Sequence, residues 1–268
     1  MSLSPNELQN VKLLVSYDGT DYCGWQKQKD HKYGPDKPSL QETIEIALSR
    51  LLNEKIDLCA SGRTDAGVHA VGQVAHFQTS RPLPKDLCWA LRSLLPSSIA
   101  VRSAWIAPTE FHSTLSAVRK TYRYWIWNSQ RPTALLSRYS HWVRFPLDLD
   151  YLNTQAQILV KNQDFKSFQS VGTPVQTTVR EVFRAHWKKK KNHLVEFEIT
   201  GSGFLKQMVR NIVGTQMDLC LKGQPIEKME EILQARDRTK AGTTAPPQGL
   251  FLSRVYYPRE LDNQCRQI

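Results

Sequence analysis

One short segment of the chain has a composition suited to acid–base or nucleophilic chemistry. It reads SGRTDAGVHA from Ser61 to Ala70 and holds one carboxylate, Asp65, between the cation of Arg63 and Gly67. Apolar stretches flank the segment, and its two glycines permit a tight backbone turn that aims one side chain into a cleft. A solvated hairpin turn is the competing interpretation, because Asp and Gly are common in such turns.

A carboxylate held in this way can act as a nucleophile, as a base or as an electrostatic stabiliser of a developing cation. Each role requires the ionised form in a poorly solvated pocket, and therefore a cationic partner. Arg210 is the candidate partner, since it lies in the otherwise apolar helical run GFLKQMVRNIVG. On such a face an arginine either extends its charge to solvent or pairs with a buried acid.

A third candidate is the aromatic strand RKTYRYWIW, from Arg119 to Trp127. Strand alternation places Tyr122, Tyr124 and Ile126 on one face. One interpretation is burial on both faces of the strand, with no ligand. The other is that the strand supplies a stacking platform for an unstacked base.

Six segments of the chain, in this order, resemble the bacterial tRNA pseudouridine synthase A family. GRTDAGVHA is the most specific of them, whereas short pieces such as KSF carry little information alone. The segments are YDGTDYCGWQ (Tyr17–Gln26), SGRTDAGVHAVGQVAHF (Ser61–Phe77), RKTYRYWI (Arg119–Ile126), DFKSF (Asp164–Phe168), GFLKQMVRNIVG (Gly203–Gly214) and TAPPQGLFLSRVYY (Thr244–Tyr257).

The resemblance implies an isomerase that converts uridine to pseudouridine in tRNA, at positions 38 to 40 of the anticodon stem-loop. It implies that Asp65 is the catalytic carboxylate, that Arg210 is its cationic partner and that Tyr122 stacks on the target uracil. Arg63 is expected to contact tRNA and to help fill the space left by the flipped base. The resemblance also implies a homodimer, and the redox-neutral isomerisation needs neither a cofactor nor a metal.

Further RNA contacts are expected at Phe111, His112, Arg81, Gly172 and Gln176. The family usually has an arginine and an aromatic residue where this chain has Thr114 and Leu115, and this departure argues against a direct phosphate contact there. The polar, basic stretch Lys27–Pro38 is expected to be a loop, either an inert insertion or an RNA contact.

Hydrophobic periodicity indicates the elements that position these groups. Ser39 and Glu42 form a capping box at the start of the first expected helix. The resulting β-α-β-β-α-β order is that of a split βαβ, or ferredoxin-like, fold. Strands are expected at Val11–Tyr17, Ile56–Ala60, Val71–Gln78 and Ile99–Ile106, and helices at Ser39–Leu52 and from Pro84 onward.

The second half of the chain repeats this order of elements. Strands are expected at Lys120–Trp127, Val179–Lys188, Leu194–Thr200 and Phe251–Tyr257, and helices at Leu152–Lys161, Phe204–Leu221 and Ile226–Ala235. The expected fold class is therefore α+β, with two ferredoxin-like (split βαβ, RRM-like) lobes and antiparallel sheets. Residues 1–110 are expected to form the N-terminal catalytic lobe, and residues 111–268 the C-terminal lobe with the aromatic strand and the MVRNIVG helix. The resemblance implies that the two sheets join around a central active-site cleft.

The composition of the chain indicates which kind of molecule it binds. The 268 residues include 36 Lys and Arg against 25 Asp and Glu, a formal net charge of +11 that suits a polyanion such as tRNA. Five scattered cysteines without a C-x-x-C pair fit a reducing compartment, and with seven dispersed histidines they predict no metal cluster. Neither a signal peptide nor a membrane span is visible, so a cytoplasmic protein is expected.

Two other functions remain open. A non-catalytic RNA-binding module built from two split βαβ lobes would share the basic charge and the aromatic strand. A metal-free glycosidase or nucleoside hydrolase would also place a carboxylate at a glycosidic carbon. Such an enzyme usually needs a second carboxylate as acid, and none lies near Asp65 in the sequence.

Overall fold

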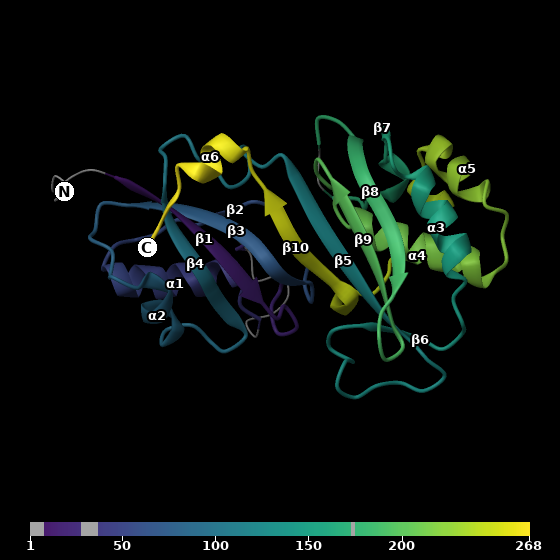
Figure 1. Ribbon diagram of the computed structural model, residues 1–268, viewed down its shortest axis with the longest axis horizontal. Helices are drawn as coiled ribbons and strands as arrows, with labels where there is room; N and C mark the ends of the chain where they lie inside the picture. The colour runs from purple at the N-terminus through teal and green to yellow at the C-terminus, as the bar shows by residue number, and fades with distance from the viewer. Residues whose placement is uncertain (1–7, 28–36, 173–174) are drawn as a thin grey trace. The chain divides into compact units, whose positions relative to one another are not determined.

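The computed structural model describes residues 8–27, 37–172 and 175–268, so that most of the expected Lys27–Pro38 loop lies outside the described residues. The chain folds into two compact units (Figure 1). The first unit comprises the chain up to Val118 together with Leu252–Ile268, and the second comprises Arg119–Phe251. The last strand and helix therefore fold with the first unit, whereas the sequence analysis assigned residues 111–268 to a single lobe.

The first unit is built on a sheet with strand order β11-β4-β1-β3-β10. The central strand β1 pairs antiparallel with both neighbours, so that Leu13 lies opposite Ala75 on one side and Ala104 on the other. The short strand β2 pairs antiparallel with β3. The strands are β1 (Gln9–Tyr17), β2 (Cys59–Ala60), β3 (His69–Thr79), β4 (Ile99–Ala107), β10 (Leu250–Tyr256) and β11 (Arg266–Gln267).

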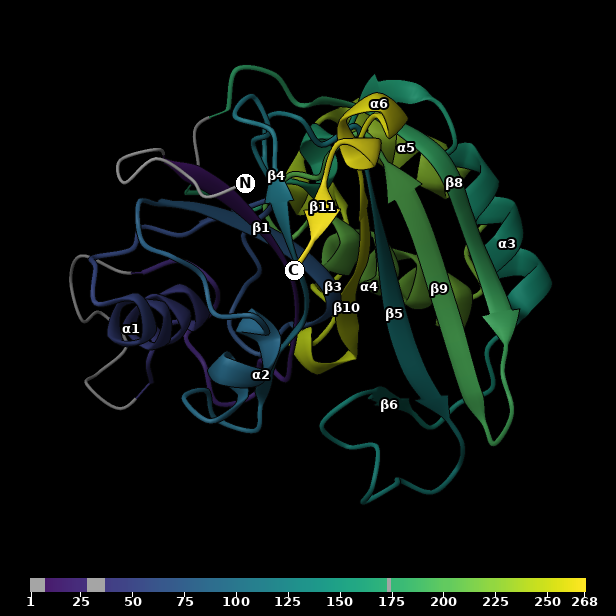
Figure 2. The same cartoon turned by 60° about the vertical axis from the view of Figure 1, so that its left-hand side comes forward.

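Two helices, α1 (Leu40–Leu52) and α2 (Leu87–Arg92), complete this unit and lie side by side (Figure 2). The expected cap of α1 is confirmed, since Ser39 Oγ accepts a hydrogen bond from the Glu42 backbone N at 3.1 Å. Apolar side chains that recur at helical spacing in α1 and at alternate positions in β1 are fully buried, each stabilising the fold by about 1.5–3 kcal/mol. They include Ile44, Leu48, Val11, Leu13 and Val15.

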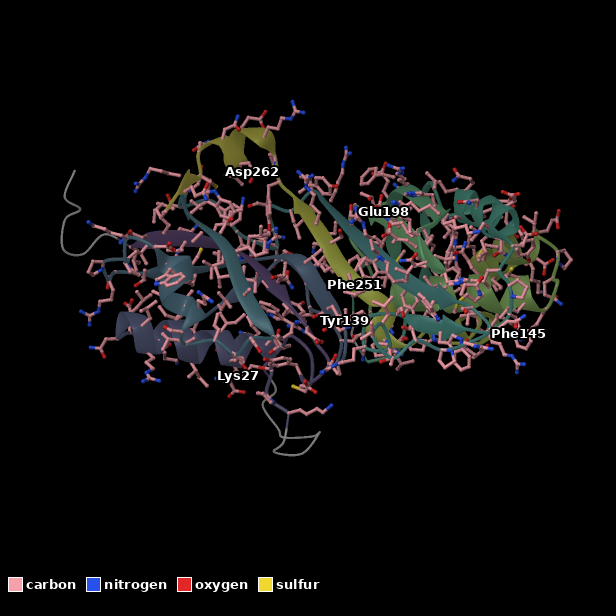
Figure 3. All side chains as sticks on the ribbon, turned by 60° about the horizontal axis from the view of Figure 1, so that its bottom comes forward. Lys27, Tyr139, Phe145, Glu198, Phe251 and Asp262 are labelled. Atoms are coloured by element: carbon pink, nitrogen blue, oxygen red, sulfur yellow. The ribbon has the colours of Figure 1, made fainter. Side chains whose placement is uncertain are left out.

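The returning C-terminal segment is attached to the first unit by a charged contact as well as by strand pairing. Strand β11 pairs with β4. In the helix α6 (Arg259–Asn263), Asp262 Oδ1 lies 2.6 Å from Lys12 Nζ (Asp262 is labelled in Figure 3). The Lys12 side chain is only 9% exposed, and its ammonium group lies about 5 Å from the centres of three aromatic rings. The rings are those of Trp105, Phe111 and Tyr257.

The second unit is built on a sheet with strand order β5-β9-β8-β7, in which neighbouring strands are antiparallel, and β6 pairs parallel with β5 (Figure 2). The strands are β5 (Arg119–Asn128), β6 (His141–Val143), β7 (Asn162–Asp164), β8 (Val179–Lys189) and β9 (Leu194–Gly201). The helices are α3 (Leu149–Ile158), α4 (Met208–Leu221) and α5 (Lys228–Ala235).

Helix α4 is largely buried, and several of its polar side chains are enclosed. Asn211 is fully buried, donates to the Phe168 carbonyl at 2.8 Å and accepts from Arg238 at 3.1 Å. The helix begins four residues later than expected from Phe204. Gln207 adopts a left-handed conformation, with φ of 58°, and ends the preceding turn before the helix starts.

The α+β class and the repeated β-α-β-β-α-β order are confirmed. The expected strand Ile56–Ala60 is shorter, because side chains of α1 bind its first backbone N–H groups. Ser49 Oγ accepts from Ile56 N, and Glu45 Oε1 accepts from Leu58 N, both at 3.0 Å. The short elements β6, β7, β11 and α6 were not expected, since two to five residues are too few to show a periodicity.

Candidate active site

Asp65 lies in the connection between β2 and β3, in the first unit. The loop is bound to the segment that follows β1: an isolated bridge joins Gly24 to Asp65, and Trp25 N donates to the Thr64 carbonyl at 3.0 Å. Val68 N in turn donates to the Asp65 carbonyl at 3.2 Å. The Asp65 side chain is half-buried. A half-buried carboxylate on a loop fixed from both sides can be presented to a substrate in one orientation.

Glycines allow the two segments to approach this closely. A Cβ atom at Gly19 would lie 2.0 Å from the Val68 carbonyl oxygen. At Gly24, whose φ is 112°, a Cβ atom would lie 2.8 Å from the Thr64 carbonyl oxygen. The YDGTDYCGW segment therefore serves as a backbone support for the loop that carries Asp65.

A buried polar network lies directly beneath the loop. Gln73 of β3 accepts from Ser61 Oγ at 2.9 Å and donates to the Gly62 carbonyl at 2.8 Å. Tyr17 Oη and Thr64 Oγ1 share a hydrogen bond of 2.8 Å. Burial raises the pKa of the Tyr17 phenol well above its ordinary value, so it remains a neutral hydrogen-bonding group. The sequence analysis missed this network, although a glutamine in an apolar strand is a signal for it.

Arg210 lies in the first turn of α4, in the second unit, and is half-buried. Its Nε donates to the Ala245 carbonyl at 2.8 Å, and Ala245 N donates back to the Arg210 carbonyl at 3.1 Å. Next to it, Tyr124 Oη donates to the Pro246 carbonyl at 2.8 Å. Burial raises the pKa of Tyr124, and the positive charge of Arg210 opposes that rise. The guanidinium group is thus held by its own unit rather than extended freely into solvent.

Tyr122 lies on β5, on the same buried face as Tyr124 and Ile126, as the alternation predicts. Its side chain is 8% exposed and meets the ring of Phe204 edge-on, with the ring centres 5.1 Å apart. Phe204 is a second residue that the sequence analysis did not single out. Its ring holds the tyrosine ring in this orientation. An aromatic pair with this geometry stabilises the fold by about 0.5–1.5 kcal/mol beyond the contribution from burying the two rings.

The structure places the candidate residues in two sets. Asp65 and Arg63 share one loop of the first unit, where Arg63 is exposed, and Tyr122 and Arg210 belong to the second unit. The pairing of Asp65 with Arg210 stays a prediction.

The remaining candidates for RNA contact differ in exposure. Arg81 follows β3 and is exposed, as are Gly172 and Gln176 on either side of residues 173–174. The ring of Phe111 is 1% exposed and packs against Tyr257 at 4.9 Å. It belongs to the core of the first unit, and its expected contact with RNA stays a prediction.

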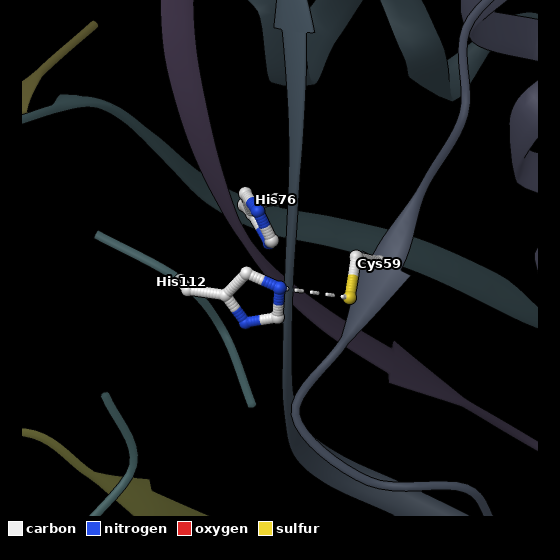
Figure 4. A group of neighbouring side chains, drawn as sticks. All are labelled: Cys59, His76 and His112. Atoms are coloured by element: carbon white, nitrogen blue, oxygen red, sulfur yellow. Dashed lines mark hydrogen bonds between the residues drawn. The ribbon is translucent and has the colours of Figure 1, made fainter. Parts of the chain in front are cut away.

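His112 is half-buried and joins an unexpected cluster. Cys59, His76 and His112 lie together in the first unit, with no two of their candidate ligand atoms more than 4.8 Å apart (Figure 4). The expectation that the dispersed cysteines and histidines form no such cluster is therefore wrong. The three residues come from separate strands and a turn, so their spacing in the sequence gave no sign of their proximity.

Among the described residues, no helix has the length and apolar character needed to cross a bilayer. The family model described as "tRNA pseudouridine synthase" matches residues 13–114 and 156–258, which is more than half of the chain.

Curated relatives match nearly the whole chain. The tRNA pseudouridine synthase A of Bdellovibrio bacteriovorus is 57% identical over 262 residues, covering 96% of this chain and 98% of its own length. Enzymes of the same name from Acetivibrio thermocellus and Caldicellulosiruptor bescii are each 41% identical, covering 93% of this chain and 100% of their own. The chain therefore belongs to the tRNA pseudouridine synthase family.

Proposed function

We propose that the protein converts uridine to pseudouridine in tRNA, at positions 38 to 40 of the anticodon stem-loop, with Asp65 as the catalytic carboxylate and no cofactor. The observation that supports this most is the loop of Asp65. It presents a half-buried carboxylate on a backbone fixed by the preceding segment and by the buried Gln73 network, in a chain of this family.

The chemistry explains why such a carboxylate is needed. Pseudouridine forms when the N1–C1′ bond of uridine breaks, the uracil turns, and C5 bonds to C1′ while its hydrogen leaves. Bond breaking leaves positive character on the sugar and negative charge on the uracil. An ionised Asp65 beside the sugar attacks C1′, removes a sugar proton or stabilises the cation, and these three roles remain alternatives.

Residues of the second unit complete the proposed site. Arg210 pairs with Asp65 and keeps the carboxylate ionised in a poorly solvated place. Tyr122 stacks on the target uracil, with its ring oriented by Phe204.

Arg63, on the same loop of the first unit as Asp65, contacts the tRNA and occupies the space that the flipped nucleotide leaves, and its exposure suits that role.

The wider properties of the proposed enzyme follow from its substrate. The net charge of +11 supports a large polyanionic partner, and most of the affinity is expected to come from phosphate contacts. We expect a cytoplasmic homodimer, as the family resemblance implies. Arg81, Gly172 and Gln176 are exposed and remain proposed RNA contacts, whereas Phe111 is buried in the core of the first unit.

The direct test uses an unmodified tRNA transcript labelled with tritium at C5 of uridine. Because C5 loses its hydrogen when it bonds to C1′, turnover releases tritium, and nuclease digestion followed by mass spectrometry locates the pseudouridine. Transcripts with cytidine at positions 38, 39 or 40 should lose the corresponding product. Free uracil would instead indicate a nucleoside hydrolase, and binding without product would indicate a non-catalytic RNA-binding module.

A further inference from the structure

Three side chains with metal-ligating atoms meet on one face of the first unit's sheet. Cys59 of β2 lies directly opposite His76 of β3 in the strand register, so both side chains point to the same face. His112 comes from the turn after β4, and its Nε2 lies 3.8 Å from Cys59 Sγ (Figure 4). All three side chains are half-buried, so that they are fixed by packing yet reachable from solvent.

The ring of His76 is oriented by its neighbours. Ser113 Oγ donates to the Cys59 carbonyl at 2.7 Å, and this uses the only hydroxyl proton. His76 Nδ1 lies 2.9 Å from the same oxygen and accepts from the Ser113 backbone N at 3.3 Å. With Nδ1 as an acceptor the ring proton lies on Nε2, and a metal ion would replace it there.

The turn holds His112 in the complementary orientation. Its Nδ1 accepts from the backbone N of Thr114 and of Leu115, both at 3.2 Å, and Nε2 is thereby directed at the cysteine sulfur. A metal ion at Nε2 would replace the ring proton there. The proton would then occupy Nδ1, and the two long contacts to the turn would open.

We propose that Cys59, His76 and His112 form a binding site for one thiophilic divalent ion, with Zn²⁺ as the best match. A thiolate with two imidazoles is a donor set that Zn²⁺ favours, and a solvent molecule supplies the fourth position. Tetrahedral Zn²⁺ places sulfur and nitrogen ligands about 3.6 Å apart, close to the 3.8 Å between Cys59 Sγ and His112 Nε2. The candidate ligand atom of His76 lies within 4.8 Å of the other two.

The site would add a metal link between three parts of the first unit that hydrogen bonds already join, among them those from Ser113 Oγ to the Cys59 carbonyl and from Thr114 Oγ1 to the Ala60 carbonyl. Strand β2 contains only Cys59 and Ala60, and it leads directly into the loop that carries Asp65. An ion bound to Cys59, His76 and His112 connects β2 to β3 and to the turn after β4. Its role is to stabilise this support, and the isomerisation needs no electrons or Lewis acid from it.

The test uses Co²⁺ as a spectroscopic probe of the purified full-length protein after removal of metal by a chelator. We expect one Co²⁺ per chain, with a thiolate-to-cobalt charge-transfer band, the intense visible bands of a tetrahedral ion, and displacement by Zn²⁺. Cys59→Ser should abolish the charge-transfer band, and His76→Asn should weaken binding by about 10-fold or more. Cys88→Ser is the matched control, since Cys88 is also a half-buried thiol of the first unit, and it should leave the spectrum unchanged.

A second measurement keeps the proposal testable if Cys59→Ser fails to fold. In the unaltered protein, Zn²⁺ should slow alkylation of Cys59 but not of Cys88, as located by peptide mass spectrometry. Two results would overturn the proposal. One is the absence of a thiolate–cobalt band at saturating Co²⁺, together with no protection of Cys59 by Zn²⁺. The other is a spectrum that survives both Cys59→Ser and His76→Asn, which would show that the cluster is a hydrogen-bonded polar contact only.

Discussion

The two units hold their site residues in opposite ways. In the first unit Asp65 lies on a loop, fixed by backbone hydrogen bonds and by buried neutral side chains around Gln73. In the second unit Tyr122 and Arg210 lie on a strand and a helix, held by an aromatic contact and one carbonyl. A loop has no repeating hydrogen bonds of its own, so it needs a polar support, whereas regular elements position side chains by packing. Asp65 in the first unit should therefore respond differently to substitution from Tyr122 and Arg210 in the second.

The largest effect on pseudouridine formation is expected for Asp65, the carboxylate on the loop of the first unit. Asp65→Asn keeps the shape of the side chain and removes its charge, so pseudouridine formation should fall by ~10³-fold or more. The affinity for tRNA should change only a few-fold, because phosphate contacts supply most of it. Tritium release and filter binding measure the two quantities separately. Substantial turnover by the variant would show that the chemistry lies elsewhere.

Arg210 tests whether the second unit contributes charge to the reaction. Arg210→Ala should lower kcat by ~10²-fold or more, because a buried carboxylate is left without its cation. Arg210→Lys should restore only part of the rate, since lysine lacks the planar fork of donors. Arg236→Ala, at an arginine whose side chain is 66% exposed, is the control for simple loss of charge. Equal rates for the Arg210 and Arg236 variants would contradict the proposed pairing.

Tyr122 separates the ring from its hydroxyl. Tyr122→Phe retains the contact with Phe204 and should retain partial activity. Tyr122→Ala loses the stacking platform, worth about 1–3 kcal/mol per base, and should lose far more. Steady-state kinetics on one tRNA transcript compares the two variants. If both fell equally to background, the hydroxyl would take part in the chemistry and a role in stacking alone would be insufficient.

The support beneath the loop should have a smaller and mixed effect. Gln73→Leu removes the buried donor to the Gly62 carbonyl and one buried acceptor of the Ser61 hydroxyl, and it should cost about 1–3 kcal/mol of unfolding free energy. It should also lower kcat with little change in KM, because Asp65 is positioned less well. Urea denaturation and kinetics give the two values. A variant that is less stable but fully active would show that the network supports the fold alone.

The last prediction concerns the pH dependence of stability in the second unit, with no expected effect on the reaction. Burial lowers the pKa of Lys120 on β5 to about 8, against an ordinary value of 10.5. Below about pH 8 the ammonium is charged in both states, and the full cost of burying it, roughly 3 kcal/mol at most, is present. That cost disappears as pH rises toward 10.5, because the folded protein releases the proton first. The stability of the unaltered protein should therefore rise relative to Lys120→Met over this window, and parallel stability curves would contradict the assignment.

The elements that the sequence predicted well are those with a local signal. These signals are the Ser39 cap, the helical spacing of the apolar side chains in α1 and the alternation on β5. Each depends on residues a few positions apart. The loop of Asp65 was recognisable because its chemistry is concentrated in one short segment.

What escaped prediction depends on contacts between distant segments. Phe111 lies in a segment that suggested RNA contact, yet it is buried because Tyr257 returns to it from the C-terminal segment. The cluster of Cys59, His76 and His112 exists only after β2, β3 and the turn after β4 have paired. Hydrophobic periodicity indicates neither the burial of Phe111 nor the cluster, because both depend on the tertiary arrangement rather than on local order.

The contact between Lys12 and Asp262 has a consequence for how the protein is made. Strand β1 is synthesised early, but Leu252–Tyr256 and α6, which complete its unit, follow more than 200 residues later. At translation rates of about 5–20 residues per second, the first unit waits roughly 10–50 s for its closing segment. The second unit is continuous in the chain and is complete at Phe251, so it precedes the end of the closing segment by about 1–3 s at these rates. In proteolysis of nascent chains, the second unit should therefore become resistant to protease before the first unit does.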